Sequence, residues 1–362
     1  MENLNEQQAR KLVEECITDE RAISSTQAIL DSGAIPRLQG YAVRPGKVSD
    51  SIYGGMAGGR ENPPLLAKDG RPLRIMVRTE RISTHDITRG SIPFKDQILA
   101  ANHNYMRRLV EQDIGTSQLE VPGLEDTAVA IAAENLHTIP VENIFRAYAA
   151  KSTTSTSLYQ AYFVRGERIF AGHALPEGLI PNGPLPYIMD TPSTKSDEHD
   201  ETLDPEEMIR RGICTREQYH ALRQGGLAAF DRAARYLAEK GIILVDTKFE
   251  HGVDREGHIV SQDEILTMDS SRFWLSDDYQ EQTAKLRRGE IAELSPKSYS
   301  KEFARGFSEG DKGYTPEQRV HIAVRYIMGI QRLLGKPFVP DRRPRDERVV
   351  TGLQRIVDEL VA

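Results

Sequence analysis

The sequence predicts an α+β protein, and the order of its segments is the main reason. Strand-like patterns gather in the first part of the chain, mixed patterns follow, and helical patterns close it. Little of the chain alternates strand and helix in the βαβ order that builds a doubly wound parallel sheet. The 362 residues are enough for two or three packed units with a sizeable core.

The composition is typical of a globular protein, with 39% hydrophobic and 28% charged residues. No apolar stretch approaches the roughly 20 residues needed to cross a bilayer, and the polar, acidic N-terminus is unlike a signal or transit peptide. Cys16 and Cys214 are too few cysteines for a disulfide framework or a cysteine zinc site. A formal charge of −7 argues against a nucleic-acid surface but permits local sites for small anions. We therefore expect a cytosolic protein without nucleic-acid or membrane partners.

The first third of the chain predicts a helical stretch, a strand-rich region and a second helix. Residues 5–31 contain neither glycine nor proline and have a helical pattern. Gly40–Asp86 is strand-like, apart from the Gly/Pro-rich stretch Gly54–Pro72, which predicts a long hairpin loop or a flexible insertion. Gln97–Gln112 predicts a helix.

The remaining two thirds predict strands, a loop and two long helices. Thr138–Arg168 predicts mixed strands, and Gly172–Asp204 is a proline-rich segment typical of a functional loop. Glu217–Lys240 predicts a long amphipathic helix. Thr315–Gln318 has a threonine cap, proline at the first helical position and glutamine at the third, so a further helix begins there. Gly335 is placed to end that helix.

The segment 241–274 is the most informative part of the sequence. The apolar strand Ile242–Val245 runs directly into three charged residues at alternating positions: Asp246, Lys248 and Glu250. Side chains at alternating positions of a strand share one face, roughly 6.5–7 Å apart. Two carboxylates and an ammonium are therefore expected along one side of a strand that begins like a core strand.

A hairpin turn at Asp254–Gly257 leads to a return strand with two further acids. A two-residue loop sets Asp263 opposite Lys248, whereas a loop one residue longer brings Glu264 to that face. Either register gathers three acids and a lysine. The face is either a solvated surface or a Mg²⁺–nucleotide site. We favour the second, because charges seldom line such a strand unless they are paired or bound to a metal.

Together with four other segments, 241–274 resembles the family of phosphoribosylaminoimidazole-succinocarboxamide synthase, the SAICAR synthetase of purine biosynthesis. The resemblance extends from about Arg44 to Arg305. The runs DTKFEHG and DEILTMDSSRFW are close to a family signature. The other segments that carry the resemblance are Arg44–Val48, Glu80–Lys95, Glu142–Ser152 and Leu175–Glu201.

The resemblance implies a two-lobed ATP-binding fold, with a small antiparallel β lobe, a larger α+β lobe and a helical C-terminal region. The expected division begins with an N-terminal helical extension (1–39) and a small ATP-binding lobe (40–140). A central catalytic lobe (141–280) and a helical C-terminal region (281–362) follow. The implied activity is that of an ATP-dependent ligase. ATP phosphorylates the carboxylate of carboxyaminoimidazole ribonucleotide. The amine of L-aspartate then attacks the acyl phosphate, giving SAICAR, ADP and phosphate.

The resemblance also assigns residues to ATP and Mg²⁺. Glu250 and Asp263 are expected to hold Mg²⁺–ATP, while Asp246 and Lys248 organise the phosphates and the substrate carboxylate. Gly46 and Lys47 resemble a family turn in which backbone N–H groups and a lysine hold phosphate oxygens.

Other residues are expected at the ribonucleotide. Arg146 presents a guanidinium fork that matches phosphate or carboxylate geometry. Arg272 is the best candidate for the 5′-phosphate, and Asp269 is expected to accept from the imidazole amino group. The further residues that the resemblance gives to the substrate are Ser83, Asp86, Ser152, Ser271, Lys301 and Arg305.

The polar segment around Lys195 is expected to meet the remaining ligands. Lys195 attracts anionic aspartate or a phosphate, and Asp200 holds the incoming amine or takes its proton. His199 is not expected to bind a metal, because no second histidine lies at ligand spacing. Lys95 is expected to face ATP or the substrate, and Trp274, the only tryptophan, is expected in the core.

The chain departs from the family pattern at Ser49, Glu80, Asp96, Lys151, Ser300 and Gly306. Those at Ser49, Lys151, Ser300 and Gly306 keep open a non-catalytic nucleotide-sensing homologue. A small-molecule kinase on a related ATP scaffold is a second alternative, because it shares the acids and lysines. The sequence leaves the oligomeric state and the role of the N-terminal helix open.

Overall fold

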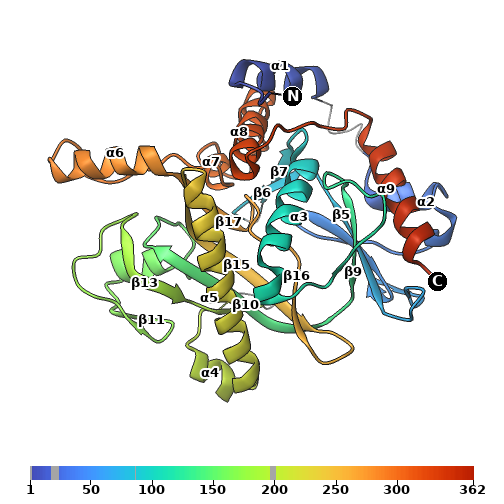
Figure 1. The fold of residues 1–362 in the computed structure, drawn as a ribbon, viewed down its shortest axis with the longest axis horizontal. Helices are drawn as coiled ribbons and strands as arrows, with labels where there is room; N and C mark the ends of the chain where they lie inside the picture. The colour runs from blue at the N-terminus through green and yellow to red at the C-terminus, as the bar shows by residue number, and fades with distance from the viewer. Residues whose placement is uncertain (1, 18–23, 86, 196–200) are drawn as a thin grey trace. The chain divides into compact units, whose positions relative to one another are not determined.

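The computed structural model describes residues 2–17, 24–85, 87–195 and 201–362, and the chain forms two compact units (Figure 1). Unit 1 consists of residues 1–105, 117–136 and 301–362, and unit 2 of residues 106–116 and 137–300. Both ends of the chain therefore belong to unit 1. In the described residues, no helix is long and apolar enough to cross a membrane.

A five-stranded antiparallel sheet forms the centre of unit 1. Its strands, in spatial order, are β1 (Arg44–Pro45), β2 (Ser49–Tyr53), β5 (Leu73–Arg78), β9 (Ala130–Glu134) and β8 (Gln118–Leu119). Ile52 and Ile75 lie opposite each other in the sheet and are fully buried. They share a core with α2 (Thr26–Asp31) and α9 (Arg345–Leu360). This common core places the N-terminal and C-terminal parts of the chain in one unit.

The Gly/Pro-rich stretch 54–72 contains a short hairpin, β3 (Gly55–Ala57) with β4 (Arg60–Asn62). Its turn is Gly58–Gly59, with φ of 55° and 78°, a region that glycine occupies without steric cost. Leu65, further along, lies in the core of unit 1. The strands that flank this stretch, β2 and β5, pair antiparallel, so the prediction of a long hairpin loop is confirmed.

The helix α8 (Pro316–Leu334) begins and ends as predicted. Thr315 accepts from the backbone N–H of Gln318, and the Gln318 side chain accepts from the backbone N–H of Thr315, which forms a capping box. Gly335 ends the helix in the left-handed region, with φ of 64°.

The helical stretch predicted over 5–31 contains two helices, α1 (Glu6–Cys16) and α2, and residues 18–23 lie outside the described part of the chain. Both α1 and α8 belong to unit 1, and α1 packs against α8 (Figure 1). The Gln331 amide bonds both the N–H and the C=O of Leu4, just before α1.

The remaining elements of unit 1 are short, apart from α3. They are η2 (Pro36–Leu38), β6 (Arg81–Thr84), β7 (Ile87–Ser91) and α7 (Glu302–Arg305). The helix α3 (Lys95–Ile114), predicted over Gln97–Gln112, contributes its first part to unit 1 and the remainder to unit 2.

A six-stranded antiparallel sheet forms the centre of unit 2. The strands β13 (Pro184–Asp190), β10 (His137–Tyr148), β15 (Ile242–Val253) and β16 (Ile259–Gln262) follow in spatial order, with β14 (Ser193–Thr194) beside β10 and β17 (Ser271–Leu275) beside β15. The helix α5 (Arg216–Glu239), predicted over Glu217–Lys240, packs on β10 and β15 (Figure 1). Gly226 permits this approach, because a Cβ there would lie 2.2 Å from the Phe145 ring.

The mixed strands predicted over Thr138–Arg168 are wrong in their second half. The first half lies in the long strand β10, whereas η3 (Gln160–Val164) follows as a helical turn. The proline-rich stretch Gly172–Asp204 begins with β12 (His173–Ala174) and also contains β13 and β14. The other elements of unit 2 are β11 (Ile169–Phe170), which pairs with β12, α4 (Pro205–Arg210) and α6 (Ser276–Arg287).

Candidate active site

The charged positions of β15 share one face of the unit 2 sheet, as predicted. Asp246, Lys248 and Glu250 lie opposite Arg146, Ile144 and Glu142 of β10. Directly opposed residues of antiparallel strands point to the same side of the sheet. Phe145 points to the other side, against α5. We call the side turned away from α5, with Glu142, Arg146, Asp246, Lys248 and Glu250, the polar face.

The ammonium of Lys248 lies between two carboxylates of the polar face. Its Nζ donates to Glu142 Oε1 at 2.6 Å and to Glu250 Oε1 at 2.8 Å. Lys195, which follows β14, pairs with the other oxygen of Glu250, and Ser193 donates to Glu142. Burial lowers the pKa of Lys248, but the charges of Glu250 and Glu142 outweigh burial and raise that pKa above its ordinary value. Lys248 therefore stays protonated at neutral pH and does not act as a base.

A second cluster joins two arginines to Asp246. Arg272 donates from Nε to both carboxylate oxygens at 2.9 Å, and Arg146 donates from Nη1 to Oδ2 at 3.3 Å. The Nε of Arg146 donates to Thr191 Oγ1 at 2.9 Å. Burial lowers the pKa of Arg146 and Asp246 opposes that shift, so the guanidinium stays charged. The three charged side chains are only 9–15% exposed, which strengthens their interaction.

Four cations gather in these two clusters. Among the described residues, Arg146, Lys195, Lys248 and Arg272 pair with Glu142, Asp246 and Glu250. Cations held in fixed positions suit an anionic ligand. Within the described residues, Arg146 makes hydrogen bonds through Nε and Nη1 only. Both N–H groups of Nη2 and one of Nη1 therefore remain for a ligand.

The β15–β16 hairpin has the longer of the two predicted loops. Gln262 lies opposite Glu250, and the N–H of Asp254 donates to the carbonyl of His258 at 2.9 Å. This register requires a loop one residue longer than a two-residue loop, so the prediction of a two-residue loop is wrong.

Neither acid of the return strand continues the ladder. β16 ends at Gln262, and the next residue, Asp263, has φ of 64°, which a strand does not adopt. Asp263 and Glu264 are therefore not strand neighbours of Lys248. The acid that contacts Lys248 from another strand is Glu142. Within the described residues, no three His, Cys, Asp or Glu side chains form a ready-made metal site.

One residue expected at the substrate, Ser271, lies away from the polar face. Ser271 is opposite Thr247 in the sheet, and their hydroxyls lie 2.7 Å apart in the interior. Because Thr247 alternates with Asp246 along β15, Ser271 points to the α5 side. Ser152 and Asp269 lie in the loops that precede η3 and β17. Ser271 is thus separated from Arg272, its neighbour in sequence.

Other predicted site residues belong to unit 1: Gly46, Lys47, Ser83, Lys301 and Arg305. Gly46 lies in a tight turn after β1, where a Cβ would lie 2.4 Å from the carbonyl of Ser49. Ser83 is buried in β6, and Lys301 and Arg305 lie at the two ends of α7. Asp86, His199 and Asp200 lie outside the described residues.

Lys95 also belongs to unit 1 and is fully buried. Its Nζ donates to the carbonyl of Arg81 at 3.1 Å and lies 5.9 Å from the centre of the Tyr326 ring. The expectation that Lys95 faces ATP or the substrate is therefore wrong. Trp274, in unit 2, is buried as expected and stacks on Tyr279.

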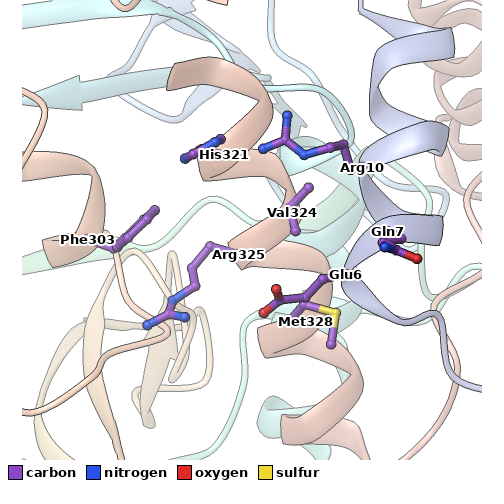
Figure 2. A pocket seen from close by; sticks show the side chains of 8 residues that line it. All are labelled: Glu6, Gln7, Arg10, Phe303, His321, Val324, Arg325 and Met328. Carbon is purple, nitrogen blue, oxygen red and sulfur yellow. The ribbon is translucent and has the colours of Figure 1, made fainter. Parts of the chain in front are cut away.

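A pocket of about 280 Å³ opens in unit 1 between α1, α7 and α8 (Figure 2). Its lining residues are Glu6, Gln7, Arg10, Phe303, His321, Val324, Arg325 and Met328. The guanidinium of Arg325 lies 5.0 Å from the centre of the Phe303 ring. None of the predicted site residues lines this pocket, so the polar face is the candidate active site.

Comparisons with known proteins agree on one family. Residues 67–317 match the family model of SAICAR synthetase. The putative phosphoribosylaminoimidazole-succinocarboxamide synthase 2 of Agrobacterium fabrum is 35% identical over 323 residues, which are 86% of this chain and 93% of that protein. The phosphoribosylaminoimidazole-succinocarboxamide synthase of Legionella pneumophila is 33% identical over 292 residues, 78% and 89% of the two chains. The structure of the Saccharomyces cerevisiae SAICAR synthase in complex with SAICAR shares the α+β fold, with a TM-score of 0.65 at 24% identity over 83% of this chain and 97% of that one.

Proposed function

Because this chain belongs to the SAICAR synthetase family, we propose that the polar face binds the ribonucleotide and supports activation of its carboxylate. The protein is an ATP-dependent carbon–nitrogen ligase of purine biosynthesis. It joins L-aspartate to carboxyaminoimidazole ribonucleotide through an acyl phosphate, giving SAICAR, ADP and phosphate. All three substrates carry negative charge, so the site needs cations in fixed positions.

The two arginines held by Asp246 are the observation that carries this proposal. A guanidinium binds phosphate or carboxylate through two parallel donors. Asp246 holds Arg146 and Arg272 in place before a ligand arrives, which lowers the entropy cost of binding. We assign Arg272 to the 5′-phosphate and the Nη2 of Arg146 to a second anionic group of the ribonucleotide.

Lys248 and Lys195 supply positive charge for phosphoryl transfer. A carboxylate accepts an amine only after activation, and phosphoryl transfer depends mainly on positioning and charge neutralisation. Lys248 is held by Glu142 and Glu250 at 2.6 and 2.8 Å. Lys195 is 42% exposed, which leaves it room to turn toward aspartate or a phosphate.

The amine of aspartate loses a proton as it forms the amide. Lys248 carries its own proton at neutral pH, so it does not accept this one. We assign the proton to Asp200 or to the departing phosphate.

The carboxylates of Glu250 and Asp263 fit Mg²⁺, because this ion prefers hard oxygen ligands and is usually bound by one or two carboxylates together with substrate phosphates. Asp263 directly follows Gln262, the residue opposite Glu250, so both acids lie at the same end of the β15–β16 ladder. Held there, the ion would neutralise charge on the ATP phosphates. In this structure Glu250 pairs with Lys195.

The remaining assignments rest on the resemblance of the segments. Gly46 and Lys47 hold ATP phosphates, and the tight turn at Gly46 exposes Lys47. The other residues assigned to the ribonucleotide are Ser83, Asp86, Ser152, Asp269, Lys301 and Arg305.

Release of ADP tests the proposal. It should require the ribonucleotide, L-aspartate and Mg²⁺ together, and the product should have the mass of SAICAR. ADP release that ignored aspartate would contradict the ligase.

Glu250→Gln tests the role of the polar face. Turnover should fall by roughly a hundredfold, because loss of the carboxylate misplaces Lys248 and the metal, while the melting temperature changes little. Glu256→Gln, in the exposed turn of the same hairpin, is the control. Near-normal turnover of Glu250→Gln would remove the metal assignment.

A further inference from the structure

Asp190 ends β13 beside Thr191, and the chemistry above gives it no role. Its carboxylate is 1% exposed and accepts from the hydroxyl of Tyr219 at 2.7 Å and from Nε of Arg223 at 2.9 Å. The Nε2 of His173 lies 3.2 Å from Oδ1 and 2.7 Å from the backbone carbonyl of Asp190. The Asp190 carboxylate therefore joins β13 to α5, and the backbone carbonyl of the same residue joins β13 to β12.

Asp190 is an anion at neutral pH. Burial raises its pKa, but the nearby His173, the hydrogen bond from Tyr219 and the charge of Arg223 outweigh burial, so the pKa lies below its ordinary value. The hydrogen bond to Asp190 raises the pKa of His173. The other ring nitrogen of His173 lies 3.1 Å from the Tyr187 hydroxyl. Hydrogen bonds to a buried carboxylate are stronger than those between neutral groups.

The end of β13 needs such an anchor. β13 lies at the edge of its sheet, where β10 is its only strand partner in the described parts of the chain. Its register shifts between Arg146 and Tyr148, so few regular ladder bonds hold it. Tyr219 and Arg223 lie one turn apart on α5 and approach Asp190 from the same helix face.

Thr191 connects this anchor to the polar face. Its backbone N–H donates to the carbonyl of Ile144 at 2.7 Å, and its hydroxyl donates to the same carbonyl at 3.3 Å. A hydroxyl has one proton to donate, so a lone pair of Thr191 Oγ1 is left for Nε of Arg146, at 2.9 Å. Thr191 and Asp246 thus hold the guanidinium of Arg146 from two sides.

We propose that Asp190 is a positioning residue for the ribonucleotide: it clamps the end of β13 so that Thr191 orients Arg146. Asp190 lies opposite Phe145 and so points to the α5 side of the sheet, away from any ligand on the polar face. It acts through Thr191 and touches no substrate. This inference rests on the proposed binding of the ribonucleotide by Arg146.

Steady-state kinetics of Asp190→Asn and Thr191→Val test the inference. Each variant should raise KM for the ribonucleotide by about tenfold and leave KM for ATP near wild type, because a misdirected guanidinium weakens one ligand only. Thr191→Ser keeps the hydroxyl and should restore the wild-type KM.

The double variant separates positioning from general loss of stability. If Asp190 acts through Thr191, Asp190→Asn adds no further rise in KM to Thr191→Val. Multiplied effects, an equal rise in KM for ATP, or a wild-type KM in Asp190→Asn would each overturn the inference.

Three further variants keep the result interpretable. Arg146→Met should raise KM for the ribonucleotide; if it does not, the proposed role of Arg146 and the inference both fail. If Arg146→Met raises KM and Asp190→Asn does not, only the inference fails.

Should Asp190→Asn not fold, Arg223→Met removes one donor from a side chain that is 49% exposed and should raise the same KM about twofold to threefold. Arg216→Met, at a more exposed position of α5, is its control, and equal values for the two would overturn the inference.

Discussion

Glu142 shows how far the polar face depends on single side chains. Its carboxylate accepts from Lys248 at 2.6 Å and is only 14% exposed. It belongs to the segment Glu142–Ser152 that resembles the family, yet the sequence did not single it out. The sequence signal for Glu142 was its position four residues before Arg146, because residues an even number of positions apart in a strand share a face.

Glu142→Gln should lower kcat by roughly tenfold to a hundredfold, because Lys248 loses one of the two carboxylates that fix its ammonium. Lys248 should stay protonated through Glu250. The measurement is steady-state turnover at saturating substrates, with melting temperature to show that the fold persists. An unchanged kcat would show that Glu142 does not position Lys248.

At the scale of elements, two departures from the family pattern meet in unit 1. Glu80, before β6, and Asp96, at the start of α3, both pair with Arg348 of α9, at 3.4 and 2.8 Å. Glu80 also accepts from the N–H of Phe94 at 3.1 Å, a residue with φ of 63°. The two unusual acids thus form one buried cluster with the C-terminal helix.

This cluster predicts how stability depends on pH. Burial, with the nearby charge of Asp96, raises the pKa of Glu80 to about 7. A carboxyl whose pKa is raised by folding favours the folded state at low pH, and that contribution is lost as pH rises from about 4.5 through 7. Glu80→Gln should therefore be more stable than wild type at pH 8, by on the order of 2 kcal/mol, with a smaller difference at pH 5.

Thermal unfolding of Glu80→Gln at pH 5 and pH 8 checks this prediction. Glu347→Gln, at an exposed position in the first turn of α9, is the control. A difference between Glu80→Gln and wild type that does not grow with pH would contradict it.

At the scale of the whole molecule, both ends of the chain build unit 1. α1 buries Ala9 and Val13 and packs on α8, so the N-terminal helix has a structural role within its unit. α2 and α9 share the core of the unit 1 sheet.

Val13→Ala should lower the free energy of unfolding by about 1–2 kcal/mol, because Val13 is fully buried and its removal leaves a cavity. Val339→Ala is the matched control, since Val339 is 52% exposed, and it should change stability by less than about 0.5 kcal/mol. Denaturant unfolding measures both. Equal losses would show that α1 contributes little packing to unit 1.

Several features followed from the sequence alone because their signals are local. Asp246, Lys248 and Glu250 share a face since a strand alternates its side chains, and Thr315 and Gly335 bound α8 since capping depends on neighbouring residues. Five segments in family order also predicted the ligase, which the family membership confirms over a kinase or a nucleotide sensor.

Only the tertiary structure decided which charges meet. Arg146 and Asp246 are 100 residues apart, and Glu142 and Lys248 are 106 apart. Their contacts depend on the register between distant strands, which is set by packing of the whole sheet. The same holds for the turn at Asp263 that ends the ladder, and for Ser271, which register places on the α5 side. Periodicity and helix caps depend on a few neighbouring residues, whereas the partner of a residue across a sheet depends on the packing of the whole fold.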